Sequence, residues 1–495
     1  MSCRLAGSGS DSNGPEADVL SSIAHRQASG WLGIRPRFRR RELGLLVLVA
    51  VALTVGSVSL GTTREMLAGE PLRLQAAQPA QLAVYLAALA VAHLAQVLAG
   101  RRTDQVLLPT VGLLGGIGLL LMERLPQDLA GSVFGDALGL AGAQLIWLVL
   151  AIAAIAVLAV VVRSDTWLRR YKYTWAAAGI GLLLLTFALG QESNGALLTL
   201  RLGPISGQPT ELLKVILVVF LAGYLSEFRP LLVEQSTRIG PLQLPPLPYL
   251  VPMVTMLAIA IGIVVIQRDL GAALLLFTVF LGLVYVATTR ISYVLIGLVL
   301  FVLGSYVAYR LFGTVRVRVD IWLHPFVDAS GDGYQIVQSL EAFARGGILG
   351  TGLGNGLPSV GGRLPIPAIH TDFPLAALGE ELGLAGILAI LGLYLIVIER
   401  GLRIAMASAD DFRALLATGL SMVVGVQAFI IAAGNLKLIP LTGITLPFIS
   451  YGGSSLTANA VVVGLLLALS DQGVEPPPPP HPAGRDVHWP GRRRP

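Results

Sequence analysis

Long apolar stretches recur along the whole chain, and short polar linkers separate them. Each stretch is about 16–24 residues long, close to the roughly 20 residues that an α-helix needs to cross the hydrocarbon of a bilayer. Apolar and polar residues do not alternate with a period of two, so helices are favoured over barrel strands. The pattern predicts an all-α polytopic membrane protein with about twelve transmembrane helices, at 42–61, 79–99, 106–122, 142–162, 173–190, 210–228, 247–266, 271–289, 292–312, 375–398, 412–433 and 455–470.

The composition agrees with a membrane protein. Hydrophobic residues make up 54% of the 495 residues and charged residues only 13%, about half the share in a soluble globular chain. The mean hydropathy is +0.75, so the chain cannot cover itself with polar side chains and lipid is its expected solvent. The single cysteine, Cys3, excludes an intrachain disulfide framework and a cysteine cluster for zinc.

The placement of basic residues predicts the orientation of the helices. The net charge of +6 comes from short clusters between apolar runs, which fits orientation in a membrane better than nucleic-acid binding. With the N-terminus inside, cation-rich and cation-poor linkers alternate through all twelve spans, so both termini are expected in the cytoplasm. The inside clusters are Arg35 to Arg41, Arg101 and Arg102, Arg163 to Lys172, Arg229 and Arg238, Arg290, Arg400 to Arg413, and Arg492 to Arg494.

The same alternation divides the chain into segments. Residues 1–41 are expected to be a polar cytoplasmic segment without a cleavable signal, and residues 471–495 a cytoplasmic tail that begins proline-rich and ends basic. Residues 313–374 form one long linker that lies outside. A linker of that length between membrane helices is usually functional or contains a folded insert.

This outside linker contains three candidate acids. Asp332 lies in a Ser-Gly-Asp-Gly sequence that is typical of a turn, and Asp320 could pair with a neighbouring arginine. Asp328 follows His324-Pro325-Phe326, in an amphipathic stretch that could lie at the membrane surface. On these residues alone, a catalytic and a structural role for Asp328 both stay open.

Six glycines between 346 and 356 match neither common nucleotide-binding pattern, and no nucleotide cofactor is expected. They indicate a loop whose backbone closely approaches a ligand or the membrane surface. His370 has no second histidine at metal-ligand spacing, so the sequence contains no metal motif there. His93, inside an apolar span, is interpreted as a hydrogen-bonded packing residue.

Charged and polar side chains also occur within or beside the predicted spans. An ionised group in hydrocarbon costs several kcal/mol, so each should face the bundle interior or a wet cavity. Ion pairs that hold helices together are the structural alternative. Glu211 and Lys214 are three residues apart, on one face of a helix. The other such positions are Gln208, Gln267, Arg268, Asp269, Glu380 and Glu381.

Five blocks of sequence resemble the SEDS family (shape, elongation, division and sporulation), whose best-known members are RodA, FtsW and SpoVE. The blocks are 207–214, 267–271, 333–339, 370–383 and 440–455, the last reading PLTGITLPFISYGGSS. They occur in the family's order within residues 105–470, and the two spans in 42–104 precede them.

The resemblance implies a ten-helix peptidoglycan glycosyltransferase core. Ten of the twelve predicted spans follow residue 104, so the predicted number of helices agrees with this core. Two departures stand out: Arg268 occupies a position where many members have proline, and the segment 194–199 lacks the family's usual tryptophan. The two additional N-terminal spans favour a RodA-like protein, although the choice between elongation and division stays open.

The family's activity would make this chain a polymerase of lipid II, a disaccharide-peptide on undecaprenyl pyrophosphate. The growing glycan would pass to the 4-hydroxyl of an incoming lipid II with inversion, and Asp328, in the position of the family's essential acid, would be the general base. The departing pyrophosphate needs positive charge, for which Arg201, Lys214 and Arg345 are candidates. A divalent cation, Mg²⁺ or Mn²⁺, would be a second source.

Polar residues in the family blocks are candidates for substrate binding. They are Gln208, Glu211, Lys214, Asp269, Tyr334, Gln335, Gln338, Ser339, His370, Asp372, Glu380, Ser450, Tyr451 and Ser454. The resemblance also implies a class B penicillin-binding transpeptidase and other elongation or division proteins as partners, in the bacterial cytoplasmic (inner) membrane. Membrane lipids are expected contacts and nucleic acid is not.

Two alternative functions stay open. A flippase or transporter for a lipid-linked precursor could use Glu211, Lys214 and Asp269 inside the membrane, although transport alone does not require the long outside linker. A scaffold that recruits other cell-wall enzymes is compatible with catalysis.

Overall fold

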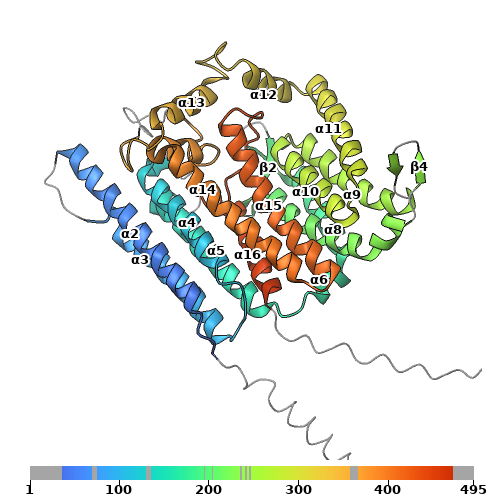
Figure 1. The fold of residues 1–495 in the computed structure, drawn as a ribbon. Coiled ribbons are helices and arrows are strands. Elements are labelled where there is room, and N and C mark those ends of the chain that lie inside the picture. Colours follow the sequence, from blue (N-terminus) through green and yellow to red (C-terminus); the bar gives the residue numbers. More distant parts are fainter. Residues whose placement is uncertain are drawn as a thin grey trace, which may run out of the picture.

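The structure is a computed structural model that describes residues 36–69, 75–129, 135–193, 196–202, 205–234, 237–239, 242–244, 247–356 and 366–471. Long helices form one bundle, with shorter elements at its ends (Figure 1). The helices are α2 (Arg40–Ala68), α3 (Pro79–Leu98), α4 (Leu107–Arg124), α5 (Gly135–Val161), α6 (Thr166–Arg170), α7 (Lys172–Leu189), α8 (Pro209–Glu234), α9 (Leu247–Ile266), α10 (Leu270–Thr288), α11 (Ile291–Leu311), α12 (Gly313–Leu323), α13 (Tyr334–Gly346), α14 (Pro374–Ala407), α15 (Asp411–Asn435), α16 (Gly453–Ser470) and a 3₁₀-helix, η1 (Gln127–Leu129).

The predicted spans coincide with helices. Within the described residues, eleven helices are long and apolar enough to cross a membrane, and each matches one predicted span. The remaining prediction, 247–266, coincides with α9, whose described apolar part is the shorter stretch Val251–Ile266. α14 runs to Ala407 rather than to residue 398, because helical hydrogen bonding continues past Glu399 and Arg400, where the apolar run ends. The helical, multi-pass fold is therefore confirmed.

Short strands form two small antiparallel sheets in the linkers on either side of α8. The first contains β1 (Gln191–Ser193), β2 (Ala196–Leu202) and β3 (Ile205–Gly207), and the second contains β4 (Thr237–Ile239) and β5 (Leu242–Leu244). Most of these strands are only three residues long, so no alternating pattern announces them in the sequence. In the segment 194–199, which lacks the family's usual tryptophan, residues 194 and 195 lie outside the described residues. Residues 196–199 begin β2, and their side chains are outside the described part of the structure.

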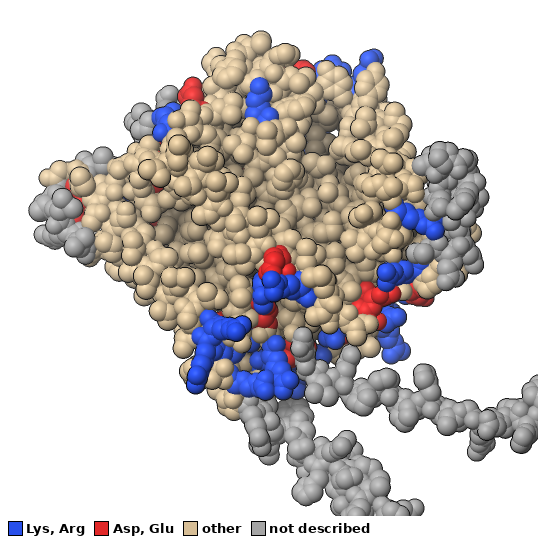
Figure 2. All heavy atoms as spheres, in the orientation of Figure 1, with Lys and Arg blue, Asp and Glu red and all other residues tan. Residues whose placement is uncertain are grey.

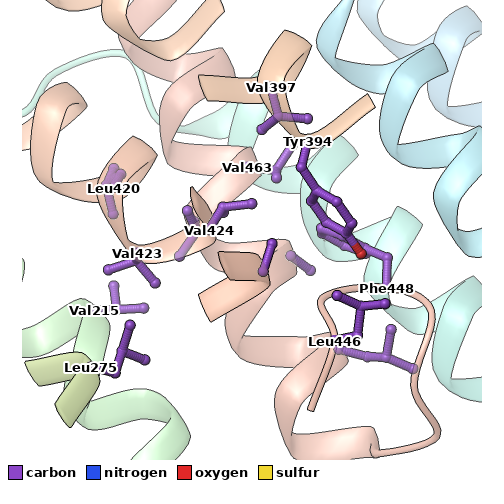
Figure 3. Close-up of a cluster of buried hydrophobic side chains, with 14 of the residues drawn as sticks. Val215, Leu275, Tyr394, Val397, Leu420, Val423, Val424, Leu446, Phe448 and Val463 are labelled. Atoms are coloured by element: carbon purple, nitrogen blue, oxygen red, sulfur yellow. The ribbon is translucent and has the colours of Figure 1, made fainter. Parts of the chain in front are cut away.

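The hydrophobic core runs through most helices of the bundle, and Figure 3 shows the part of it where α8, α10, α14, α15 and α16 meet. Val215, Leu275 and Val423 pack there from three different helices, and Tyr394 donates a hydrogen bond to Pro447 O at 2.5 Å. In the most apolar stretch of α15 and of α16, 72% of the residues are buried, whereas the share is 6% in α11. α11 therefore leaves almost its whole apolar surface for lipid.

The start of α2 and the end of α16 lie at one end of the bundle, and α12 and α13 lie at the opposite end (Figure 1). Lysine and arginine side chains gather at the first of these ends (Figure 2). This arrangement agrees with the predicted alternation, which put both termini on one side and the linker 313–374 on the other.

The two N-terminal helices pack on the rest of the bundle. α2 contacts α4, and α3 contacts both α5 and α4. The Tyr85 hydroxyl on α3 donates to Gly112 O on α4 at 2.6 Å. His93 lies 2.6 Å from Glu42 Oε1 through its Nδ1. The interpretation of His93 as a hydrogen-bonded packing residue is thus confirmed.

Candidate functional site

Asp328 lies exposed in the turn between α12 and α13. Its Oδ1 accepts a hydrogen bond from Gly331 N at 3.1 Å, and its Oδ2 accepts one from Asp332 N at 3.0 Å. These two backbone donors fix the position of the carboxylate. The other lone pairs of its oxygens face outward, where a ligand hydroxyl can reach them.

The sequence around Asp328 explains this geometry. A Cβ added at Gly331 would come within 2.2 Å of Asp328 Oδ2, so a larger residue there would displace the Asp328 carboxylate from this position. Phe326 and Val327, beside the carboxylate, are 67% and 86% exposed. Exposed apolar side chains at the end of a membrane bundle are expected to contact lipid, which places Asp328 at the membrane surface. Asp332 is a turn residue, as predicted.

A cavity of about 220 Å³ lies beside this turn and is called here the outer cavity. Its lining residues are Arg318, Ile321, Trp322, Asp332, Gln335, Ile336, Asp372, Lys437, Ile439, Leu441 and Gly443. They come from α12, α13 and the linkers that precede α14 and follow α15. Two of the predicted site residues, Gln335 and Asp372, are among them.

The two cationic residues that line the outer cavity, Arg318 and Lys437, were not predicted as site residues from the sequence. Arg318 Nη1 donates to Thr442 O at 3.2 Å, and Trp322 Nε1 donates to Lys437 O at 3.1 Å, so both side chains tie α12 to the loop after α15. Arg318 lies in an alternating Arg/Val stretch that reads as a helix end, and Lys437 lies between the recognised blocks. Their position in an outside linker, where cations are few, was the available signal.

Asp372 faces Arg318 across the outer cavity. Burial raises the pKa of the Asp372 carboxyl to about 6, while a hydrogen bond from Thr371 and the charge of Arg318 oppose that shift. The backbone here is held by Asn435, whose Nδ2 donates to Asp372 O at 2.9 Å, and Ser339 Oγ in turn donates to Asn435 O at 3.1 Å. Ser339 is therefore buried support for the cavity wall rather than part of its lining.

Ser450, Tyr451 and His370 also support this loop. Ser450 Oγ donates to Thr371 O at 2.6 Å, and Tyr451 N donates to His370 O at 2.8 Å. Burial lowers the pKa of His370, which favours the neutral imidazole. These residues fix the segment that carries Asp372, and they do not line the outer cavity.

A second, smaller cavity of about 40 Å³ is called here the inner cavity. Four predicted site residues line it: Gln208, Glu211, Lys214 and Asp269. Lys214 is only 2% exposed, and its Nζ donates to Glu211 Oε2 at 2.6 Å and to Gln427 Oε1 at 2.7 Å. An ammonium has three donors, so one remains for a ligand. The expectation that these charges face the interior is confirmed.

Asp269 connects the two cavities electrostatically. It begins α10, where its Oδ1 accepts from Ala272 N at 3.0 Å. Burial raises the pKa of Asp269, and nearby Glu211 adds to this, whereas Ala272 N–H and Arg318 oppose it. Gly443 lines both cavities. The outer and inner cavities are therefore neighbours, with Arg318 close to both.

Ser454 holds the residue that precedes α8, Gln208, which lines the inner cavity. Its Oγ accepts a hydrogen bond from Gln208 N at 3.0 Å. The last family block thus contacts the first block, although about 240 residues separate them. Spacing in the sequence does not reveal this contact.

Other predicted residues lie elsewhere. Glu380 pairs with Arg345 Nε at 3.0 Å, next to an ion pair between Glu381 and Arg124. This network joins α13, α14 and α4. Of the described residues that line the two cavities, none belongs to it, so Arg345 is better explained as a structural partner of Glu380 than as a ligand of pyrophosphate.

The glycine-rich segment packs on that network. Gly350 adopts a φ of +82°, and a Cβ there would lie 2.1 Å from Glu381 O. Thr351 N and Gly352 N donate to the carbonyls of Glu380 and Glu381, each at 3.0 Å. The predicted close backbone approach exists within the protein, where the loop packs on the first part of α14.

Three predictions remain at the edge of the site or outside the described side chains. Tyr334 begins α13 and is half-buried, and Gln338 Nε2 donates to Glu341 Oε2 at 3.0 Å on the same helix. Neither lines a cavity. Arg201 lies in β2, and its side chain is outside the described part of the structure.

Among the described residues, no group of three or more His, Cys, Asp and Glu side chains could hold a metal ion. Mg²⁺ in phosphate-handling sites is commonly bound by one or two carboxylates together with substrate oxygens. Glu211 and Asp269, which line the same cavity, are a pair of that kind.

Comparison with known proteins adds independent information. The family described as cell cycle protein FtsW, RodA, SpoVE matches residues 104–474. The "Peptidoglycan glycosyltransferase RodA" of Mycobacterium tuberculosis is 44% identical over 384 residues, 77% of this chain and 80% of that protein. The "Probable peptidoglycan glycosyltransferase FtsW" of Geobacter sulfurreducens is 34% identical over 378 residues, 74% of this chain and 95% of that protein.

A solved structure gives the same result. A chain from work described as the structural coordination of polymerization and crosslinking by a peptidoglycan synthase complex is similar, with a TM-score of 0.57 and 27% identity. The match covers 74% of this chain and 98% of the solved chain. α2 and α3 precede the region that the family shares.

Proposed function

The chain belongs to the FtsW, RodA and SpoVE family, and we propose that it is a RodA-like peptidoglycan glycosyltransferase that polymerises lipid II. The relative named RodA is more similar to it than the relative named FtsW, at 44% against 34% identity. In this reaction the growing glycan leaves its undecaprenyl pyrophosphate carrier and joins the 4-hydroxyl of an incoming lipid II.

One observation carries the proposed mechanism: an exposed carboxylate, fixed by two backbone N–H groups, lies beside a cavity whose lining includes the cationic residues Arg318 and Lys437. Asp328 accepts the proton of the sugar hydroxyl as that oxygen attacks the anomeric carbon. The α-linked donor and the β-linked product require one inversion, so a single base and no covalent sugar-enzyme intermediate suffice. The hydroxyl-bearing sugar is placed in the outer cavity.

The inner cavity is the proposed site of the departing pyrophosphate. The third N–H of Lys214 faces negative charge that increases as the glycosidic bond breaks. Arg318, close to both cavities, contributes a second positive charge that attracts the pyrophosphate of bound lipid II equally before and during bond breakage. Glu211 and Asp269 would hold a Mg²⁺ or Mn²⁺ ion, and such an ion would neutralise pyrophosphate oxygens when bound.

The protein is a multi-pass membrane protein, and we propose the bacterial cytoplasmic membrane as its location, with α12 and α13 outside. The lysines and arginines at the opposite end support this orientation (Figure 2). A class B penicillin-binding transpeptidase is the proposed partner, because the similar solved chain comes from a complex that couples polymerization with crosslinking.

Polymerisation by the purified protein in detergent tests this proposal. The protein should convert lipid II into glycan chains with no second compartment present, alone or with an added transpeptidase partner. Polymer made under these conditions excludes transport of a lipid-linked precursor as the whole function. The proposal would be contradicted by a folded, monodisperse preparation that forms no polymer, with or without the transpeptidase and with Mg²⁺ or Mn²⁺ added. Transport or a scaffold role would then remain.

A further inference from the structure

A third cavity lies at the end of the bundle opposite Asp328. Its volume is about 270 Å³, and it is called here the arginine pocket. Its lining residues are Arg37, Phe38, Arg39, Arg101, Arg102, Thr103 and Gln105. These residues come from the start of α2 and the linker between α3 and α4, and all but Gln105 precede the region shared with the family. Neither the proposed catalysis nor the recognised blocks use them.

The wall of the arginine pocket is rigidly built. Arg39 is only 2% exposed, and its guanidinium donates to Glu42 Oε2 at 3.0 Å, to Thr103 Oγ1 at 2.8 Å and to Asp104 O at 2.8 Å. Arg101 donates to Ala159 O at 2.8 Å. Because these guanidinium groups are held by protein atoms, the pocket keeps its shape without a ligand.

The acidic side chains next to the arginine pocket already have partners. Glu42 contacts Arg39 and His93, Asp471 pairs with Arg101 at 2.7 Å, and Asp104 pairs with Arg400. The remaining guanidinium groups are those of Arg37 and Arg102. Both are exposed, and within the described residues neither side chain has an acidic partner. The pocket therefore has an excess of positive charge, and its occupant should be an anion.

Planar guanidinium groups suit phosphate oxygens, which they can bind in pairs. Two sources could supply a phosphate here: a free phosphate ion or a lipid headgroup. The apolar surroundings favour the lipid. Phe38, in the pocket lining, is 74% exposed, and Leu94 and Leu98, one turn apart on α3, are also exposed. Arg37 N donates to Val97 O at 3.0 Å, so the pocket directly adjoins this apolar end of α3.

We propose that the arginine pocket binds the phosphate of an anionic phospholipid, with Arg37 and Arg102 as its ligands and Phe38, Leu94 and Leu98 against the acyl chains. Lysine and arginine side chains gather below the ends of α2 and α3 (Figure 2). Basic pockets at the ends of membrane helices are suited to anionic headgroups. The two additional helices thus carry a lipid site that is independent of the proposed catalytic site.

The test measures binding of fluorescent phosphatidylglycerol to the full-length protein in detergent micelles. The variant Arg37→Gln/Arg102→Gln should bind at least about tenfold more weakly, because each basic residue near a phosphate contributes about fivefold. Arg40→Gln/Arg41→Gln is the matched control: it removes the same charge from the neighbouring positions, which do not line the pocket. This control should bind within about twofold of the parent.

Competition distinguishes the two sources of phosphate. Unlabelled phosphatidylglycerol should displace the probe, whereas phosphatidylcholine and inorganic phosphate at the same concentration should not. If both double variants lost the same affinity for phosphatidylglycerol, the proposed binding site would be wrong, and the lipid would bind to a diffuse basic surface instead. Displacement by inorganic phosphate as strong as by the lipid would overturn the lipid assignment. Both variants should retain the parental polymerisation rate, which verifies that each is folded.

Discussion

The turn around Asp328 and the cluster around Lys214 hold their charges in opposite ways. Asp328 is exposed, and within the described residues its carboxylate accepts hydrogen bonds from two backbone N–H groups. Lys214 is buried, and side chains from α8 and α15 surround it. A base must meet a different sugar hydroxyl in each cycle, so it benefits from access. A cation that stabilises a leaving group benefits from the low dielectric of a buried site.

The difference predicts that the two regions fail differently when mutated. Substitution of an exposed carboxylate held by backbone donors should remove chemistry and leave stability almost unchanged. Substitution of one partner of a buried pair should reduce both, because the other charge is left buried without compensation.

The largest effect is expected for Asp328→Asn. The side chain keeps its size and its Oδ1 acceptor for Gly331, but it can no longer take up a proton. Polymerisation of lipid II should fall by at least about a hundredfold. Asp320→Asn is the control, since Asp320 is an exposed acid on neighbouring α12. A parental rate in Asp328→Asn, or an equal loss in Asp320→Asn, would remove Asp328 as the base.

Lys214→Met should lower the polymerisation rate by about thirtyfold, the value of one strong charge-assisted hydrogen bond. It should also lower the free energy of unfolding by about 3 kcal/mol, because Glu211 remains buried without its partner. The double variant Glu211→Gln/Lys214→Met removes both charges. It should recover most of the stability and none of the rate, whereas recovery of both would show that the pair is only structural.

Arg318→Gln should have a smaller effect. Arg318 is close to Asp372 and Asp269 and donates to Thr442 O, so the variant loses charge at the junction of the two cavities. We expect KM for lipid II to rise about tenfold with little change in kcat, because the interaction is made in both the ground state and the transition state. Arg316→Gln, two residues away and stacked on Tyr309, is the control. A fall in kcat with constant KM would assign Arg318 to the reacting atoms.

Most of the fold could be predicted from the sequence. Hydrophobic run length determines where helices cross a bilayer, and all twelve predicted spans coincide with helices. Several helices extend beyond the predicted boundaries, α14 by the largest number of residues: it continues through Glu399, Arg400 and Arg403, since a helix can leave the apolar region without ending. The short strands around α8 had no periodic signal.

The site was predicted only in part. The family blocks identify Glu211, Lys214 and Asp269, which meet in the inner cavity. They do not separate lining residues from supporting ones: Ser339 and Ser450 donate to backbone carbonyls behind the outer cavity. Arg318 and Lys437 were missed because their role depends on a contact between α12 and the loop after α15, and that contact joins residues more than a hundred positions apart.

The smallest effect concerns pH and Asp372. Its folded pKa of about 6 lies above the unfolded value of about 3.9, so the folded protein binds more protons between these values. The free energy of unfolding should therefore fall as the pH rises from about 4 to 6 and stay lower above pH 6. Asp372→Asn cannot ionise. A pKa shift of this size corresponds to at most about 3 kcal/mol, and because Asp372 is only half-buried, screening by water reduces this value. In detergent at pH 7 the variant should therefore be more stable than the parent by about 1 kcal/mol, with no difference near pH 4. Thermal unfolding of both proteins across this range measures the difference. Asp332→Asn, which removes an exposed acid from the same cavity, is the control for the loss of one carboxylate. Parallel curves for the parent and Asp372→Asn would mean that Arg318 already compensates the Asp372 carboxylate.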